Sequence, residues 1–150
     1  MSETNKFYVS WEEFHKDTKV LSEKIKVLNE DWKGILSVTR GGLVPAGIMA
    51  SELKIKAIET ISISSYENKE RAELHILKHP DINLVQNGKG WLVIDDLVDK
   101  GETAKEIKKL LPKAIIATVY AKPSGKADAD IYAKDLEQST WIVFPWEIED

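Results

Sequence analysis

Three aspartates follow an apolar run in the second half of the chain. The run that begins at Trp91 ends at Asp95 and Asp96, and Asp99 follows three residues later. A glycine turn comes next, and Thr103 lies in the first turn of an expected helix. Because open parallel sheets bind ligands at the carboxyl ends of their strands, the acids should lie beside the free N–H groups of a helix start.

This arrangement suits a substrate that carries sugar hydroxyls, a phosphate and a magnesium-bound diphosphate. Carboxylates accept hydrogen bonds from hydroxyls and are hard oxygen ligands for Mg²⁺, while a helix N-terminus favours phosphate. Two other interpretations stay open on the residues alone. Asp95 and Asp96 could cap the following structure, or they could bind a metal in an unrelated Mg²⁺-dependent phosphotransfer site.

The segment Val93–Ala104 resembles the phosphoribosyl pyrophosphate (PRPP) motif of type I phosphoribosyltransferases: an apolar strand, two acids, a short apolar spacer and Asp-Thr-Gly-Gly-Thr. Over about residues 8–147 the chain is similar to the bacterial xanthine-guanine branch of that family. The motifs that carry this likeness, in the same order, are Trp32-Lys-Gly-Ile, Thr39-Arg-Gly-Gly-Leu-Val-Pro45, Ile63-Ser-Ser-Tyr66, Ala121-Lys-Pro123, Thr140-Trp-Ile142 and Pro145-Trp146.

The resemblance implies a PRPP site along the whole acidic segment. Asp95 and Asp96 would bind the ribose hydroxyls and the magnesium shell, with Asp96 the stronger metal candidate. Asp99 would be catalytic, lying beside the purine N7 and managing the proton lost as the base attacks; its alternative role is a helix cap. The PRPP-binding residues expected here are Asp95, Asp96, Leu97, Val98, Asp99, Lys100, Gly101, Glu102 and Thr103.

Arg40 and Gly41 resemble the pyrophosphate loop of the family. An arginine can grip a diphosphate with two charge-assisted hydrogen bonds, and a glycine lets backbone approach closely. The resemblance also implies a cis peptide between Arg40 and Gly41. The alternative is a plain Gly-Gly turn between a strand and a helix.

The resemblance places the purine against Lys122, Trp141 and Ile142, together with Asp99. An ammonium group only donates, so Lys122 would bind the O6 of a 6-oxopurine and reject the 6-amino group of adenine. Trp141 would stack on the base, and the Ile142 carbonyl would accept from the guanine 2-amino group. The alternatives are a solvated surface lysine and a core tryptophan.

The chain departs from the family pattern at several positions. Lys100 replaces the usual threonine, and Glu102 replaces the second glycine. Ala72 lies where the family places an arginine for pyrophosphate, so Arg71 is only a weak candidate for that contact. Relatives continue beyond the position of Asp150 with an apolar tail, which leaves quaternary structure and membrane association open.

Around these residues the pattern predicts an α/β fold with a mainly parallel central sheet flanked by helices. Ser10 and Glu13 form a capping box before a helix over residues 11–28. Residues 65–89 form a polar excursion with short strands, and its first part, from Tyr66 to about Lys78, would be a mobile lid. The other expected elements are strands at Gly34–Thr39, Ala57–Ser64, Trp91–Asp95 and Ala114–Ala121, and helices at Leu43–Leu53 and Glu102–Leu111.

The composition is that of one soluble domain spanning residues 1–150. The net charge of -4 gives no reason to expect nucleic-acid binding. The absence of cysteine excludes a thiolate nucleophile or metal site, and the chain shows neither a signal peptide nor an apolar run long enough to span a membrane. We therefore expect a cytoplasmic protein, with peripheral attachment to the inner membrane left open. The resemblance implies a homodimer or homotetramer.

The function expected from the resemblance is purine salvage. The enzyme would transfer 5-phosphoribosyl from PRPP to N9 of guanine, xanthine or hypoxanthine, with Mg²⁺ as cofactor. The alternative is a non-catalytic regulator of the same fold that binds PRPP or a purine. The sequence does not rank the three bases.

Overall fold

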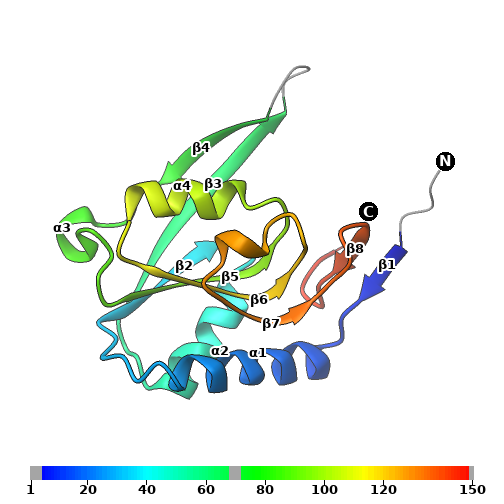
Figure 1. Ribbon diagram of the computed structural model, residues 1–150, viewed down its shortest axis with the longest axis horizontal. Helices are drawn as coiled ribbons and strands as arrows, with labels where there is room; N and C mark the ends of the chain where they lie inside the picture. Colours follow the sequence, from blue (N-terminus) through cyan, green and yellow to red (C-terminus); the bar gives the residue numbers. More distant parts are fainter. Residues whose placement is uncertain (1–4, 68–71, 149–150) are drawn as a thin grey trace.

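A computed structural model describes residues 5–67 and 72–148, and within them a six-stranded sheet forms the centre of the molecule (Figure 1). The strand order is β4-β3-β2-β5-β6-β7, and every neighbouring pair is parallel except β3 and β4. The predicted α/β fold is confirmed. The bounds of the strands are β2 Gly34–Thr39, β3 Ile58–Glu67, β4 Ala72–Lys78, β5 Trp91–Val98, β6 Ile115–Ala121 and β7 Ile131–Asp135.

Helices cover both faces of this sheet (Figure 1). Helices α1 (Trp11–Lys26) and α2 (Leu43–Leu53) pack together on one face, and α4 (Glu102–Leu110) lies on the other with the short α3 (Ile82–Val85). The side chain of Ser10 caps α1 by accepting from the Glu13 N–H at 3.0 Å, as predicted.

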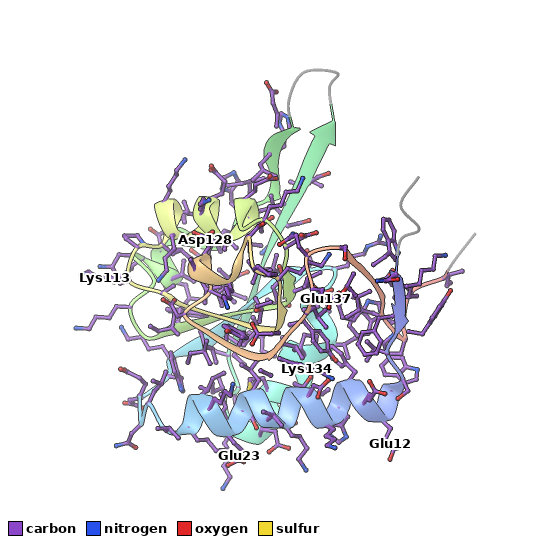
Figure 2. All side chains as sticks on the ribbon, turned by 45° about the vertical axis from the view of Figure 1, so that its right-hand side comes forward. Glu12, Glu23, Lys113, Asp128, Lys134 and Glu137 are labelled. Atoms are coloured by element: carbon purple, nitrogen blue, oxygen red, sulfur yellow. The ribbon has the colours of Figure 1, made fainter. Side chains whose placement is uncertain are left out.

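The amphipathic pattern of α1 explains how it packs. Phe14, Leu21 and Ile25 on its apolar stripe are fully buried, whereas charged side chains such as Glu12 and Glu23 point away from the sheet (Figure 2). The helix ends at Lys26 rather than at Leu28, which is 42% exposed and contributes no core contact that would extend the helix.

Strand β5 lies near the middle of the sheet and is buried on both faces. Leu92 and Ile94 belong to the core under α1 and α2, and Trp91 and Val93 belong to the core under α4. This alternation is the period of a β-strand, and a continuous apolar run is typical of a strand covered on both sides. The strand also runs three residues past the predicted end, to Val98, because Asp95, Leu97 and Val98 pair with β6.

A second, two-stranded parallel sheet joins β1 (Asn5–Tyr8) to β8 (Thr140–Val143). In Figure 1 it lies on the side toward which β6 and β7 point. Edge-to-face contacts of Phe14 with Phe144 and Trp146, whose ring centroids are 5.9 and 4.8 Å away, join it to α1. Strands β1, β7 and β8 were not predicted from the sequence, because they are short and their apolar and polar residues alternate less clearly than those of the core strands.

The excursion over residues 65–89 is an antiparallel hairpin followed by α3. Strands β3 and β4 pair from Ser62 and Lys78 to Glu67 and Ala72 and extend away from the body of the molecule (Figure 1). Residues 68–71, which include Arg71, lie outside the described residues. Within the described part of the chain, none of the helices has the length and apolarity needed to cross a membrane.

We expect Phe14→Ala to lower the free energy of unfolding by about 3–5 kcal/mol, because the ring is fully buried among aromatic side chains that hold β8 against α1. Urea unfolding measures the change. Val27→Ala, at a position that is 83% exposed, is the matched control and should change it by less than about 0.5 kcal/mol. If Phe14→Ala lowers the free energy of unfolding no more than Val27→Ala does, this packing is contradicted.

Candidate active site

The two neighbouring carboxylates at the end of β5 face different hollows. Asp95 lines a pocket of about 320 Å³ that also contains Leu97, Val98 and the turn into α4. Asp96 faces a second hollow with Arg40, Gly41 and Glu147. Successive side chains of a strand point to opposite sides, so this division follows from the strand itself.

Burial makes these carboxyls unusually weak acids. It raises the pKa of Asp95 well above its ordinary value, and the neighbouring charge of Asp96 raises it further. Burial also raises the pKa of Asp96, to about 6, with a contribution from the charge of Glu147. The Asp96 N–H donates to Asp95 Oδ1 at 2.8 Å, but no ion pair among the described residues involves either carboxylate.

The loop between β2 and α2 packs tightly against the end of β5. A Cβ on Gly41 would collide with the Asp96 carboxylate, and one on Gly42 would collide with the carbonyls of Ile94 and Val38. Both glycines are therefore required by close approach, which a plain turn would not demand. The cis peptide joins Thr39 to Arg40, so the expected position, between Arg40 and Gly41, is wrong by one residue.

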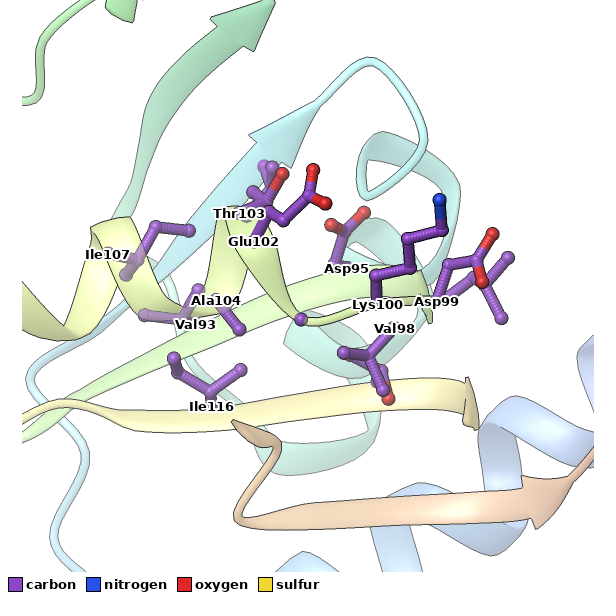
Figure 3. Close-up of a pocket in the computed structure, with 14 residues that line it drawn as sticks. Val93, Asp95, Val98, Asp99, Lys100, Glu102, Thr103, Ala104, Ile107 and Ile116 are labelled. Carbon is purple, nitrogen blue, oxygen red and sulfur yellow. The ribbon is translucent and has the colours of Figure 1, made fainter. Parts of the chain in front are cut away.

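The turn from β5 into α4 lines the Asp95 pocket from Asp99 to Thr103. Figure 3 shows the Lys100 and Glu102 side chains extending from it to the same side as Asp95. Gly101 has a positive φ of 86°, and a Cβ there would collide with the carboxylate of Asp128.

The charged side chains around this turn differ in their partners. Asp128 pairs with Lys105 of α4 at 3.5 Å. Lys100 and Glu102 are both exposed, and no ion pair joins them in the part of the chain that the structure describes. The Glu102 carboxylate is therefore screened by solvent rather than by Lys100.

Asp99 lies between two donors. Its Oδ1 accepts from Gln138 Nε2 at 2.7 Å, and its Oδ2 lies 3.4 Å from Lys122 Nζ. Lys122 is only 6% exposed, which excludes the solvated surface lysine. No interaction of a helix cap is found for the Asp99 side chain, since Gly101 precedes α4 and no side chain caps that helix.

Trp141 and Ile142 lie on β8, outside the lining of the Asp95 pocket. Trp141 is 57% exposed, so the interpretation of Trp141 as a core residue is wrong. The Ile142 side chain is buried in the core beneath β8. Gln138, which contacts Asp99, lies in the segment that directly precedes β8.

Sequence reasoning missed Gln138, Glu147 and Asp128. Gln138 is separated from Asp99 by 39 positions and lies in an irregular segment, so no spacing rule could join them. Glu147 directly follows the Pro145-Trp146 motif, and this neighbour was the one sequence signal that could have placed it near the site. No group of three or more acidic or histidine side chains suited to a metal occurs in the described residues.

The phosphoribosyl transferase domain family matches residues 7–150. Xanthine-guanine phosphoribosyltransferase of Desulfotalea psychrophila is 51% identical over 143 residues, which cover 94% of this chain and 86% of that protein. The enzyme of the same name from Idiomarina loihiensis is 47% identical over 143 residues, or 95% of this chain and 87% of that protein.

Solved structures show the same fold. The purine phosphoribosyltransferase of Pyrococcus horikoshii superposes with a TM-score of 0.77 at 28% identity, covering 97% of this chain and 96% of that one. The Helicobacter pylori xanthine-guanine-hypoxanthine phosphoribosyltransferase superposes with a TM-score of 0.80 at 25% identity, covering 96% of this chain and 95% of that one.

The raised pKa values make a prediction about the ligand-free protein. An unfolded aspartate has a pKa of about 3.9, so the folded protein binds more protons than the unfolded chain between about pH 4 and pH 6. The free energy of unfolding therefore falls as the pH rises through that window. We expect Asp96→Asn, which removes the titrating group, to raise it by about 2–3 kcal/mol at pH 7.5 and by less than about 1 kcal/mol at pH 4.

Urea unfolding at both pH values measures this difference, with Glu137→Gln, at an exposed position, as the control. If Asp96→Asn is equally stabilised at both pH values, or destabilised at pH 7.5, the pKa of Asp96 is not raised in the folded protein.

Proposed function

This chain belongs to the phosphoribosyl transferase family, and from its site we propose that it transfers 5-phosphoribosyl from PRPP to N9 of guanine, xanthine or hypoxanthine. It is a phosphoribosyltransferase of purine salvage, and its products are the nucleoside monophosphate and pyrophosphate. The observation that carries the proposal is the single pocket that gathers Asp95 with the residues from Leu97 to Thr103 at the carboxyl end of β5.

In the proposed complex the pocket holds the ribose 5-phosphate part of PRPP. The Asp95 carboxylate accepts hydrogen bonds from ribose hydroxyls. The 5-phosphate binds at the start of α4, where Gly101, Glu102 and Thr103 present backbone N–H groups at the positive end of the helix dipole. Gly101 can take the required backbone conformation because it has no Cβ.

The second hollow suits the pyrophosphate and a magnesium ion. Mg²⁺ is usually held by one or two carboxylates together with substrate phosphates, which agrees with Asp96 in this hollow. Asp95, the weaker metal candidate, lines the neighbouring pocket. A bound Mg²⁺ would neutralise negative charge on the departing pyrophosphate. Arg40 adds a charge-assisted grip on the same group, and Asp96 must lose its proton before it can act as a ligand.

The reaction forms a bond between the purine N9 and C1′ of the ribose and breaks the bond from C1′ to the pyrophosphate oxygen. The electron pair of the broken bond leaves with the pyrophosphate. The purine loses its N7 proton, which the Asp99 carboxylate accepts as general base. Most of the acceleration comes from holding the two substrates in line, with charge stabilised where it develops.

Recognition of the base depends on Lys122 and on β8. The Lys122 ammonium is held beside Asp99 and donates to the purine O6, so it favours 6-oxopurines over adenine. The exposed ring of Trp141 is free to stack on the base, which is worth about 1–3 kcal/mol per base. The Ile142 carbonyl accepts from a 2-amino group.

The segment from Tyr66 to about Lys78, part of which lies outside the described residues, is proposed as the lid that excludes water from the activated sugar. A homodimer or homotetramer and a cytoplasmic location are also proposals, which the family resemblance alone supports. No feature of the described residues supports membrane attachment.

The alternative of a non-catalytic regulator is not favoured, because the similar proteins carry the names of enzymes.

We expect pyrophosphate release with PRPP, Mg²⁺ and guanine, and with at least one other 6-oxopurine, but less than about one tenth of that kcat/KM with adenine. The reason is that Lys122 can donate to O6 but cannot accept from a 6-amino group. Adenine turnover equal to that with guanine would contradict the base assignment, and no turnover with any base would favour the regulator.

We expect Glu102→Gly to change the KM for PRPP by less than about tenfold, because the exposed carboxylate is screened while its backbone N–H still faces the phosphate. Thr103→Val should raise that KM more, since it removes a hydroxyl from the pocket lining. Lys113→Gln, at an exposed position beyond α4, is the control. A KM for PRPP that falls a hundredfold in Glu102→Gly would show that the carboxylate is not screened, and an unchanged KM in Thr103→Val would contradict the proposed phosphate site.

A further inference from the structure

We propose that Gln138 is a positioning residue that fixes the Asp99 carboxylate for proton transfer from the purine. The Gln138 Nε2 donates to Asp99 Oδ1 at 2.7 Å, and its Oε1 accepts from the Ser124 N–H at 2.8 Å. This inference rests on the proposed role of Asp99 as general base.

The direction of both hydrogen bonds is determined by the backbone. A peptide N–H can only donate, so the side-chain oxygen of Gln138 must face Ser124, and its amide nitrogen must face Asp99. Gln138 therefore donates to the carboxylate and cannot accept from it. A donor that is itself held by the backbone fixes the position of Oδ1 and with it the orientation of the carboxylate.

The contact also determines which oxygen of Asp99 is free to react. The short bond from Gln138 occupies Oδ1, whereas Oδ2 lies 3.4 Å from Lys122 Nζ, beyond an ideal charge-assisted distance. Lys122 can therefore turn its remaining donors to the purine O6 without releasing Asp99 entirely. We assign the proton from the purine N7 to Oδ2.

Gln138 joins the three segments that are proposed to hold the base. Asp99 follows β5, Ser124 lies two residues after Lys122 at the end of β6, and Gln138 lies two residues before β8, which carries Trp141. Without this bridge the half-exposed Asp99 side chain, 49% accessible, would be held only by the longer contact with Lys122. Asparagine is one methylene too short to make both contacts, and an ionised glutamate cannot donate.

The test measures steady-state kinetics with PRPP and guanine for Gln138→Met, which keeps the length and removes the donor. We expect kcat to fall about tenfold, as for loss of a hydrogen bond to a charged group, while the KM for PRPP changes less than about twofold. Glu137→Gln, an exposed neighbour in the same segment, should keep the wild-type kcat. A kcat of Gln138→Met within about twofold of wild type overturns the proposal.

The pH profile of Gln138→Glu adds a second test, because a residue with a purely structural role would leave that profile unchanged. A second carboxylate against Asp99 disfavours its ionised form, so the acid limb of the kcat–pH profile should shift by about one unit to higher pH. Lys122 is the charged group in contact with Asp99, and Asp95, Lys100 and Glu102 line the same pocket; all four are unchanged in this variant. An unshifted acid limb contradicts the proposal.

Asp99→Asn separates this inference from the proposed function. If Asp99→Asn lowers kcat at least about tenfold and Gln138→Met does not, only the proposed role of Gln138 is wrong. If Asp99→Asn keeps the wild-type kcat, both the proposed mechanism and the role of Gln138 are wrong. In the double variant, Gln138→Met should have almost no further effect on kcat, because the two residues act as one unit. Full additivity would contradict that. Thermal unfolding within about 3 °C of wild type excludes misfolding as the cause.

Discussion

Two adjacent, partly buried carboxylates lie at the carboxyl end of β5, and no ion pair among the described residues neutralises them. Burial raises the pKa of both, to about 6 for Asp96, and this costs folding free energy at neutral pH. The rest of the site is arranged around this constraint. The Gly41 loop approaches the Asp96 carboxylate closely, and the pocket of Asp95 opens toward the start of α4. The arrangement is best explained by a ligand that brings the missing positive charge.

Buried apolar residues hold the strand that carries these carboxylates. Trp91 to Ile94 are buried on both faces of the sheet, so β5 is held firmly up to the first carboxylate. Beyond that point the residues belong to the site, and hydrogen bonds between distant segments hold them. The Asp99 carboxylate contacts Lys122 and Gln138, and the aromatic contacts of Phe14 with Phe144 and Trp146 hold β8 nearby.

The strands and helices with strong apolar patterns were predictable from the sequence. Strand β2 and helix α2 have the predicted bounds, and α4 ends one residue before the predicted end. The short β1, β7 and β8 were not predictable, because tertiary pairing rather than local pattern forms them. The acids from Asp95 to Asp99 were identified because they follow the apolar run that begins β5, and the family resemblance supplied their roles. The contact of Gln138 was not, since it joins segments that no period of the sequence relates, and the cis peptide lies one residue before the place that the family resemblance implied.

We expect bound Mg²⁺ to favour the charged form of the Asp96 carboxylate. Carbon-13 NMR of aspartate-labelled protein can follow the titration of Asp96 before and after saturation with Mg²⁺ and PRPP, with Asp96→Asn used to assign the resonance. We expect the pKa of Asp96 to be about 6 in the free protein and to fall below about 4 in the complex, since a neighbouring cation favours the charged form. A value near 4 in the free protein, or one that the ligands do not change, would contradict this account.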